Sequence, residues 1–196
     1  MMDPPPDDEA CEAYLIFALN ILGGDDNNGL TNDELGELER VLGVTLPFEV
    51  GLLLVMGVPS EARWIRWNDD PAAKWAGWNT RLHEAVVAAV ELDDLWVSSW
   101  GQRPDEAGER SDAIATLLAD APPLLPLYDD RAIPLTTARD VDMAESNPVL
   151  SIEHTGVTVR GTDLANWLHR EFDVPLPMWP ETAARWFPFW SELPSS

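Results

Sequence analysis

A β-hairpin followed directly by a helix is the pattern that most constrains how this chain can fold. Two runs of β-prone residues, Val149 to His154 and Val157 to Arg160, are separated by Thr155-Gly156, a spacing typical of a hairpin. Thr162 is then placed to cap a helix, because its side chain can accept a hydrogen bond from a free N–H of the first turn. We expect the hairpin and the helix to pack on each other as one unit.

The expected helix has an apolar stripe that defines its buried face. Leu164, Trp167, Leu168 and Phe172 lie at offsets of 0, 3, 4 and 8 residues, the spacing of one helical face. Glu171 falls in the same stripe, so we expect its carboxylate at the rim of the packed face.

Strand and helix patterns are mixed along the chain. A length of 196 residues fits a single domain with a substantial core. The expected divisions are an acidic, proline-rich tail over 1–9, an N-terminal helix and turn over 10–29, and the main domain with an aromatic C-terminal tail over 30–196.

Targeting signals and cysteine chemistry are both weak in this sequence. No apolar run approaches the roughly 18 residues that a membrane span needs, and the N-terminus lacks the basic stretch of a secretory signal. The single cysteine, Cys11, excludes an internal disulfide and a cysteine-rich zinc site. We therefore expect a cytoplasmic protein that does not contact membranes.

The formal net charge of −23 is the strongest anomaly of the composition. It argues against nucleic-acid binding, because the phosphate backbone attracts clusters of Lys and Arg and repels an acidic surface. Two interpretations of the charge stay open. Acidic residues favour solubility, and they also steer a basic partner toward its binding surface.

The N-terminal half reads as helices joined by short turns. Thr31 and Glu34 have the spacing of a capping box and predict a helix that ends at Gly43. Leu46-Pro47 starts another helix, with Pro47 at its first position. Residues Asp25 to Gly29 are a turn, since alignment with a calcium-binding loop fails at both its first and last ligand positions.

The middle of the chain alternates predicted strands and helices. Short strands are expected at Trp64 to Trp67 and at Leu95 to Ser98. A helical stripe of Leu82, Ala85, Val86, Ala89 and Val90 lies between them. Asp105 to Ala119 reads as a further helix with an acidic first turn, and Pro122 to Pro134 as strand-like segments punctuated by proline.

Residues suited to catalysis are few and scattered. The only histidines are His83, His154 and His169, and no two of them have the sequence spacing of metal ligands. The sequence has no nucleophile elbow, phosphate loop or HExxH string. Acidic doublets point to opposite faces of a strand, so they seldom share a proton. We expect no catalytic residue, no cofactor and no metal site.

Ten tryptophans are available for the core and for binding. We expect those inside predicted elements to be core residues: Trp64, Trp96, Trp100 and Trp167. Those around a predicted turn are the candidates for an exposed aromatic patch: Trp67, Trp75 and Trp78. The aromatic C-terminal tail, Met178 to Leu193, is expected either to pack on the body or to form a partner surface.

Several blocks in the same order resemble the SUKH superfamily, which includes fungal cell-wall-assembly regulators and bacterial toxin-immunity proteins. The blocks are LTNDELGELERVLGVTLPFEV, the joint Trp100-Gly101-Gln102-Arg103-Pro104, LYDDRAIP, NPVLSIEHTGVTVRGTDLANWLHREF and the ending PFWSEL. Asp129-Asp130 stands where the family pattern has Gly-His, which puts any role of that histidine in doubt and adds negative charge.

The resemblance implies an α+β fold, in which a mixed or antiparallel sheet that includes the C-terminal β-hairpin is flanked by helices. It also implies a binding module, often an immunity protein that masks a toxin. Three hypotheses follow: an immunity protein for a basic, possibly nuclease, toxin domain; a regulatory or scaffold protein without a dedicated toxin; and an enzyme, which would need a pocket with converging titratable groups. We favour the first, and we predict that acids beside an aromatic anchor form the partner surface. The predicted residues are Trp67, Asp69, Asp70, Asp105, Glu106, Glu109, Asp112, Asp129 and Asp130.

Overall fold

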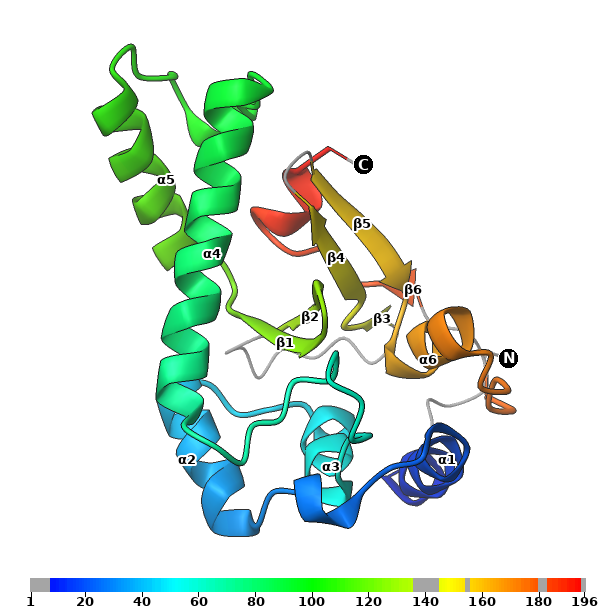
Figure 1. Ribbon diagram of the computed structural model, residues 1–196. Helices are drawn as coiled ribbons and strands as arrows, with labels where there is room; N and C mark the ends of the chain where they lie inside the picture. Colours follow the sequence, from blue (N-terminus) through cyan, green and yellow to red (C-terminus); the bar gives the residue numbers. More distant parts are fainter. Residues whose placement is uncertain (1–7, 136–144, 154–155, 180–182, 195–196) are drawn as a thin grey trace.

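A four-stranded antiparallel sheet with helices on both faces forms the centre of the molecule (Figure 1). The computed structural model describes residues 8–135, 145–153, 156–179 and 183–194. The sheet order is β1-β2-β4-β5, and its strands are Leu124–Tyr128, Arg131–Pro134, Val149–Glu153 and Gly156–Gly161. A second, parallel pair joins β3 (Glu145–Ser146) to β6 (Ala183–Ala184). The predicted α+β class and C-terminal hairpin are confirmed.

Helices make up most of the rest of the described chain. The α-helices are α1 (Asp8–Leu22), α2 (Asn32–Leu42), α3 (Phe48–Met56), α4 (Pro71–Leu92), α5 (Ala107–Asp120) and α6 (Leu164–Phe172). Three short 3₁₀ helices are η1 (Asp26–Asn28), η2 (Ser98–Trp100) and η3 (Trp190–Glu192). The first helix begins at Asp8, two residues before the expected start, so Asp8 and Glu9 belong to its first turn.

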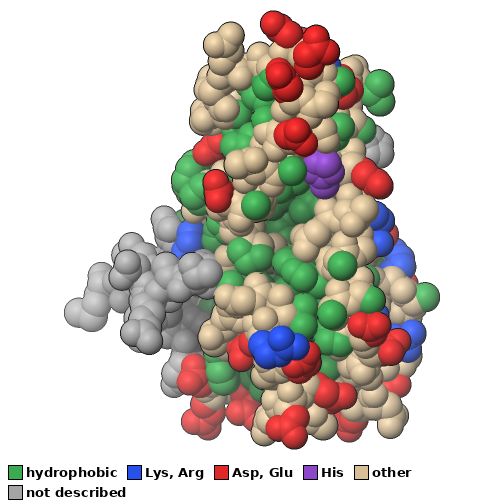
Figure 2. Space-filling view, turned by 90° about the vertical axis from the view of Figure 1, so that its left-hand side faces the viewer, with side chains coloured by type: hydrophobic (Ala, Val, Ile, Leu, Met, Phe, Trp, Pro, Cys, Tyr) green, Lys and Arg blue, Asp and Glu red, His purple; other side chains and the backbone are tan. Residues whose placement is uncertain are grey.

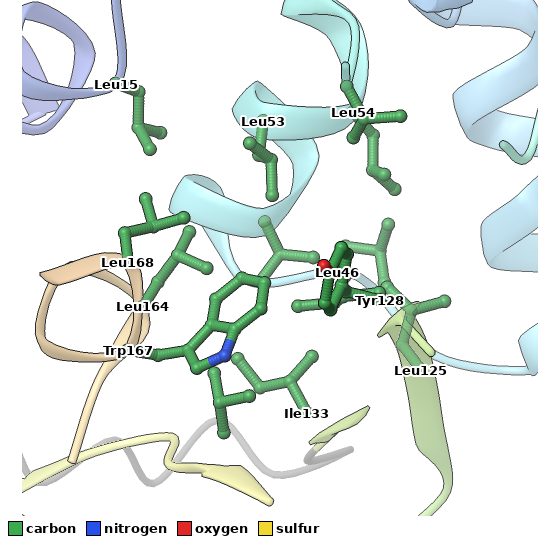
Figure 3. Close-up of a cluster of buried hydrophobic side chains, with 14 of the residues drawn as sticks. Leu15, Leu46, Leu53, Leu54, Leu125, Tyr128, Ile133, Leu164, Trp167 and Leu168 are labelled. Carbon is green, nitrogen blue, oxygen red and sulfur yellow. The ribbon is translucent and has the colours of Figure 1, made fainter. Parts of the chain in front are cut away.

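Successive residues of the central strands face two different hydrophobic clusters, as the pleat of a strand requires. On β2, Ala132 belongs to one cluster and Ile133 to the other. The first cluster packs α1, α2, α3 and α6 against one face of the sheet (Figure 3). The second packs α4, α5 and the C-terminal segment against the opposite face. Because both faces are covered, β1 is buried along its whole length.

The predicted hairpin and the helix that follows it pack on each other, as expected. Strands β4 and β5 pair in antiparallel fashion, and α6 lies against β5. Trp167 and Leu168 are fully buried, while Phe172 is partly buried and stacks on Trp64. Thr162 is not the cap: Asp163 holds that position, and its carboxylate accepts a hydrogen bond from the Asn166 N–H at 2.7 Å.

Two segments that were predicted as strands, Trp64 to Trp67 and Leu95 to Ser98, do not form strands. Trp64 makes only an isolated bridge to Tyr128, and both Trp64 and Trp67 are buried although a strand would point them to opposite faces. Leu95 to Ser98 has no strand assignment and leads into η2. The β-prone residues of this second segment are partly buried against the second cluster through side chains, without a ladder partner.

Candidate functional site

A groove between α4 and α5 is a prominent hollow in the described part of the chain. It has a volume of about 840 Å³, within the 300–1,000 Å³ typical of ligand pockets. Most of its wall is apolar, with Asn79, His83, Asp120 and Arg185 as the polar exceptions. The main lining residues are Trp75, Leu82, Ala115, Leu118, Ala119, Trp186, Phe187 and Trp190.

Helical periodicity explains which side chains form the two helical walls. On α4 the lining residues Trp75, Asn79, Leu82 and His83 recur at offsets of 0, 4, 7 and 8 residues, which is one face of a helix. The α5 wall is built from Ala115, Leu118, Ala119 and Asp120. Since two of these four side chains are single methyl groups, α5 leaves the space in front of it unfilled.

The third wall is the C-terminal segment, which returns across the second face of the sheet. Trp190 anchors it: its indole Nε1 donates a hydrogen bond to the Pro122 carbonyl at 2.7 Å, and its ring is buried. Further along, the Val157 N–H donates to the Pro194 carbonyl at 2.9 Å. The prediction that the aromatic tail packs on the body is confirmed, although Trp186 stays 58% exposed at the groove.

An acidic stripe runs along α5 beside the groove. Glu109, Asp112 and Asp120 are separated by intervals of three and eight residues, so they share one side of the helix. That side adjoins the one carrying Ala115 and Ala119, since consecutive residues are about 100° apart around the axis. Figure 2 shows hydrophobic side chains gathered along the middle of the face that α4 and α5 form, with acidic side chains toward its two ends.

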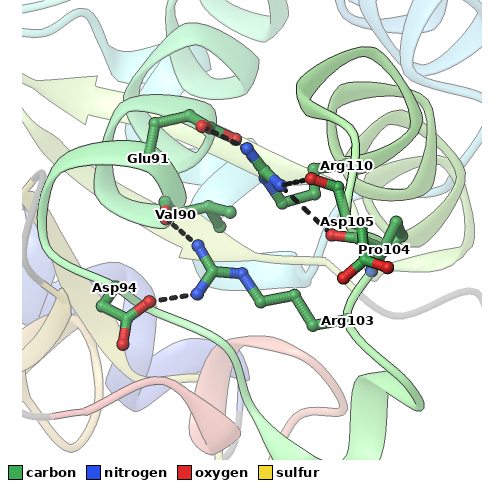
Figure 4. Close-up of polar contacts among 7 residues, drawn as sticks. All are labelled: Val90, Glu91, Asp94, Arg103, Pro104, Asp105 and Arg110. Carbon is green, nitrogen blue, oxygen red and sulfur yellow. Dashed lines mark hydrogen bonds and ion pairs between the residues drawn. The ribbon is translucent and has the colours of Figure 1, made fainter.

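Two arginines fix the connection between α4 and α5 (Figure 4). Arg110 forms a bidentate ion pair with Glu91, and its Nη1 donates to the Asp105 carbonyl at 2.6 Å. Arg103 pairs with Asp94 and donates to the Val90 carbonyl at 2.7 Å. The side chain of Arg110 lowers the pKa of Glu91 by hydrogen bonding to its charged form. These contacts hold the two helical walls in register.

The arginines leave a strong excess of negative charge at this end of the molecule. Residues 84–120 contain nine acidic residues and two arginines, a net charge of −7. Both arginines are already paired, with Glu91 and Asp94. Within the part of the chain that the structure describes, no ion pair engages Glu106, Glu109 or Asp112, and all three are exposed. Their charge is therefore directed to solvent.

The structure separates the predicted partner-binding acids into three places. Asp105, Glu106, Glu109 and Asp112 lie at or near the start of α5, before the residues of that helix that line the groove. Asp69 and Asp70 lie at the start of α4, where Asp70 caps the helix by accepting from the Ala73 N–H at 3.0 Å. Since α4 has 22 residues, its two ends are about 33 Å apart.

The third pair, Asp129-Asp130, holds the β1–β2 turn. Asp129 adopts a left-handed backbone conformation at φ 50°, and its N–H donates to the Arg63 carbonyl at 2.8 Å. Asp130 accepts hydrogen bonds from the Ser151 hydroxyl and from Arg131, and is only partly exposed. The charge of Asp130 is therefore already engaged by internal donors, and its role in partner binding stays a prediction.

Trp67 is the clearest correction among the predicted site residues. We expected it in an exposed aromatic patch, but it is 2% exposed and its indole Nε1 donates to the Pro126 carbonyl at 3.1 Å. Trp78 is buried as well, and Trp75 is partly buried. A buried ring cannot contact a partner without unfolding its surroundings, so Trp186, at the groove, replaces Trp67 as the exposed aromatic candidate.

The groove-lining alanines of α5 were not predicted as site residues, although the sequence has a weak pattern that indicates them. Ala115 and Ala119 are four residues apart, and the acids Asp112 and Asp120 border them. This places small apolar side chains next to charged ones on a helix whose partners the sequence does not reveal. Periodicity could have found the stripe, but only the packing of α4 and the C-terminal segment turns it into a groove wall.

The described histidines make hydrogen bonds to backbone carbonyls. His83 lies 3.3 Å from the Ser111 carbonyl, and His169 lies 2.9 Å from that of Val174. His154 lies outside the described residues. In the described ranges no group of three or more His, Cys, Asp or Glu side chains is arranged to hold a metal ion. None of the described helices combines the length and apolar character needed to cross a membrane.

Comparison with known proteins adds no relative to this description. No family model matches the chain, and neither a curated protein nor a solved structure matches it. The resemblance to the SUKH superfamily therefore stays a prediction from sequence blocks, and the function has to be argued from the groove and the charges.

Proposed function

We propose that this chain is a protein-binding module that binds and neutralises a basic partner, as an immunity protein does with its toxin. The observation that carries the proposal is the apolar groove bordered by the acidic stripe of α5. Apolar burial supplies binding energy, while complementary charge raises the association rate and the selectivity. A surface that combines the two is suited to a macromolecular partner of opposite charge.

The acidity of the whole chain supports a cationic partner. At a net charge of −23 the long-range field attracts basic proteins and repels nucleic acids and anionic membranes. Nucleases have basic clefts, because they bind phosphate backbones. A basic nuclease toxin is therefore the partner class we propose, and the cytoplasm is the compartment in which we propose that the two meet. The sequence blocks that resemble SUKH immunity proteins support the same class.

The described groups do not suggest an enzyme. His83 lines the groove, but the structure gives it a backbone carbonyl as its partner. Asp120 and Arg185 also line the groove, and no nucleophilic Ser, Thr or Cys is among its lining residues. We therefore propose binding, not bond-making, as the activity.

Co-expression with a toxin tests this proposal. The toxin encoded beside this gene should stop growth when expressed alone, and this chain should restore growth and bind the purified toxin one to one. Glu109→Gln with Asp112→Asn should slow association and flatten its dependence on salt, because both carboxylates are exposed. The matched control is Glu9→Gln with Glu12→Gln on α1, which removes the same charge from exposed positions elsewhere.

The results of these experiments distinguish an immunity role from a regulatory or scaffold role. Restored growth with one-to-one binding supports an immunity role. Binding to several unrelated proteins without protection would instead support a regulatory or scaffold role, and the immunity proposal would be wrong. Equal losses of association rate in the α5 variant and in the α1 control would show that only total charge matters.

A further inference from the structure

We infer that the groove between α4 and α5 receives a basic, amphipathic segment of the partner, with its apolar side chains in the groove and its Lys or Arg side chains along α5. The inference rests on the proposed function and names the surface that performs it. The groove supports the apolar part of the inference, and the acidic residues of α5 support the charged part.

The shape of the groove accounts for the apolar part. Its volume of about 840 Å³ is lined by Trp75 and Leu82 on α4, Leu118 on α5, and Phe187 on the C-terminal segment. Large rigid rings beside small alanines form a surface into which branched or aromatic side chains of a partner can insert. An apolar hollow that stays open to solvent is therefore available for a partner's side chains.

The stripe on α5 accounts for the charged part. Asp120 lines the groove, and Glu109 and Asp112 continue the same side of α5 toward its N-terminus, before the first lining residue, Ala115. The opposite wall carries a cation, Arg185, and an exposed ring, Trp186. A segment that is basic along one edge and apolar on its inner face matches this asymmetry, whereas an acidic or uniformly charged segment does not.

The groove also lies between two of the acidic groups that the sequence analysis predicted. Asp69 and Asp70 precede the first turn of α4, below Trp75, and Asp105 and Glu106 precede α5 at the other end. A positively charged segment that extends from the groove along α5 therefore approaches Asp105 and Glu106, whereas Asp69 at the start of α4 is already paired with Lys74.

A model peptide tests the inference on the isolated chain. The probe is a peptide of Leu and Lys at helical spacing, compared with a scrambled peptide of the same composition and with a Leu–Glu analogue. The amphipathic Leu–Lys peptide should bind, change the fluorescence of the groove tryptophans and lose affinity as salt is added. In NMR spectra the shifted methyl signals should include those of Ala115 and Ala119, which line the groove.

Blocking the groove supplies the matched variant. Ala119→Trp adds a ring at an exposed lining position without changing charge, and should weaken binding by about tenfold or more. Ala13→Trp makes the same exchange at an exposed position of α1, away from the groove, and should leave affinity unchanged. Unfolding curves of both variants should stay close to that of the parent, since neither alanine is buried.

Three results would overturn the inference. These are equal binding of the scrambled peptide, equal binding of the Leu–Glu analogue, or equal affinity of the Ala119→Trp and Ala13→Trp variants. The proposed function fails separately, when the chain binds the Leu–Lys peptide in the groove but does not protect against the neighbouring toxin. Conversely, protection that survives Ala119→Trp would keep the function and remove the groove.

Discussion

Gly161, the last residue of β5, lies in direct contact with the backbone of Trp167 on α6. A Cβ at position 161 would lie 2.4 Å from the Trp167 nitrogen and 2.6 Å from its Cα. Real Cβ atoms do not approach other heavy atoms this closely, and backbone atoms cannot move aside as a flexible side chain can. The absence of a side chain at Gly161 is therefore what lets the hairpin and α6 pack as one unit.

We predict that Gly161→Ala destabilises the fold by about 2–4 kcal/mol, because the added methyl group must displace α6 from β5. Chemical denaturation measures the loss. Gly36→Ala is the matched control: Gly36 lies within α2 with no heavy atom near the position of a Cβ, so alanine should stabilise by about 0.5–1 kcal/mol. Changes of the same sign in the two variants would contradict the contact described here.

Features set by near neighbours in the chain could be predicted from the sequence. The capping box of Thr31 and Glu34 forms as expected, with the Glu34 N–H donating to the Thr31 hydroxyl at 3.3 Å. The hairpin of β4 and β5 forms as well, around a gap of two residues. In both cases the partner groups are a few residues apart, so residue types and spacing contain the needed information.

Features set by distant partners could not be predicted in the same way. Sequence alone does not distinguish the rings of Trp67 and Trp186, yet Trp67 is buried, with its indole N–H bonded to the carbonyl of Pro126, 59 positions away, and Trp186 is exposed. Leu95 to Ser98 has the residue types of a strand but finds no strand to pair with. The groove needs α4, α5 and the C-terminal segment together, so no local pattern predicts it.

Trp67 and Trp186 provide a test of that correction. Trp67→Ala should lower the free energy of unfolding by about 3–5 kcal/mol, because it leaves a large cavity and removes a buried hydrogen bond. Trp186→Ala should change it by no more than about 0.5 kcal/mol, since the ring is 58% exposed. Urea titrations of both variants decide the matter. Similar losses at the two positions would contradict the difference in burial between the two rings.

Arg131 joins three elements through one guanidinium group. Its Nε and Nη2 lie 3.1 and 3.2 Å from the two carboxylate oxygens of Glu171 on α6, and its Nη1 contacts Asp130 in the turn and Ser151 on β4. The Arg131 and Glu171 side chains are 14% and 22% exposed. Arg131→Met should therefore cost about 2–3 kcal/mol, because it leaves two partly buried carboxylates without their cation.

An exposed pair serves as the control for this prediction. Arg40 pairs with Glu37 one turn away on α2, but their side chains are 71% and 47% exposed. Arg40→Met should cost no more than about 0.5 kcal/mol, because solvent screens the pair. A double-mutant cycle with Arg131→Met and Glu171→Gln isolates the coupling by denaturation. A coupling energy near zero between Arg131 and Glu171, as expected for Arg40 and Glu37, would contradict the prediction.

Tyr14 on α1 makes the free energy of unfolding depend on pH in the alkaline range. Its hydroxyl donates to the Ala165 carbonyl on α6 at 3.3 Å. Burial, and then the negative charge of Asp163, raise the pKa of Tyr14 from 10.0 to about 12. The folded chain thus keeps the phenol proton at a pH where the unfolded chain has lost it. This contribution is complete below pH 10 and is lost as the pH rises through 12.

Comparison with Tyr14→Phe isolates this effect, because the other groups that titrate in the same range are common to both proteins. The stability of the parent relative to the variant should fall by about 2–3 kcal/mol between pH 9 and pH values above 12, as order-of-magnitude linkage requires. Urea unfolding at closely spaced pH values measures the difference. Parallel stability curves for the two proteins across this range would show that the phenol of Tyr14 titrates alike in the folded and unfolded chain, and that its contact with α6 does not hold the proton.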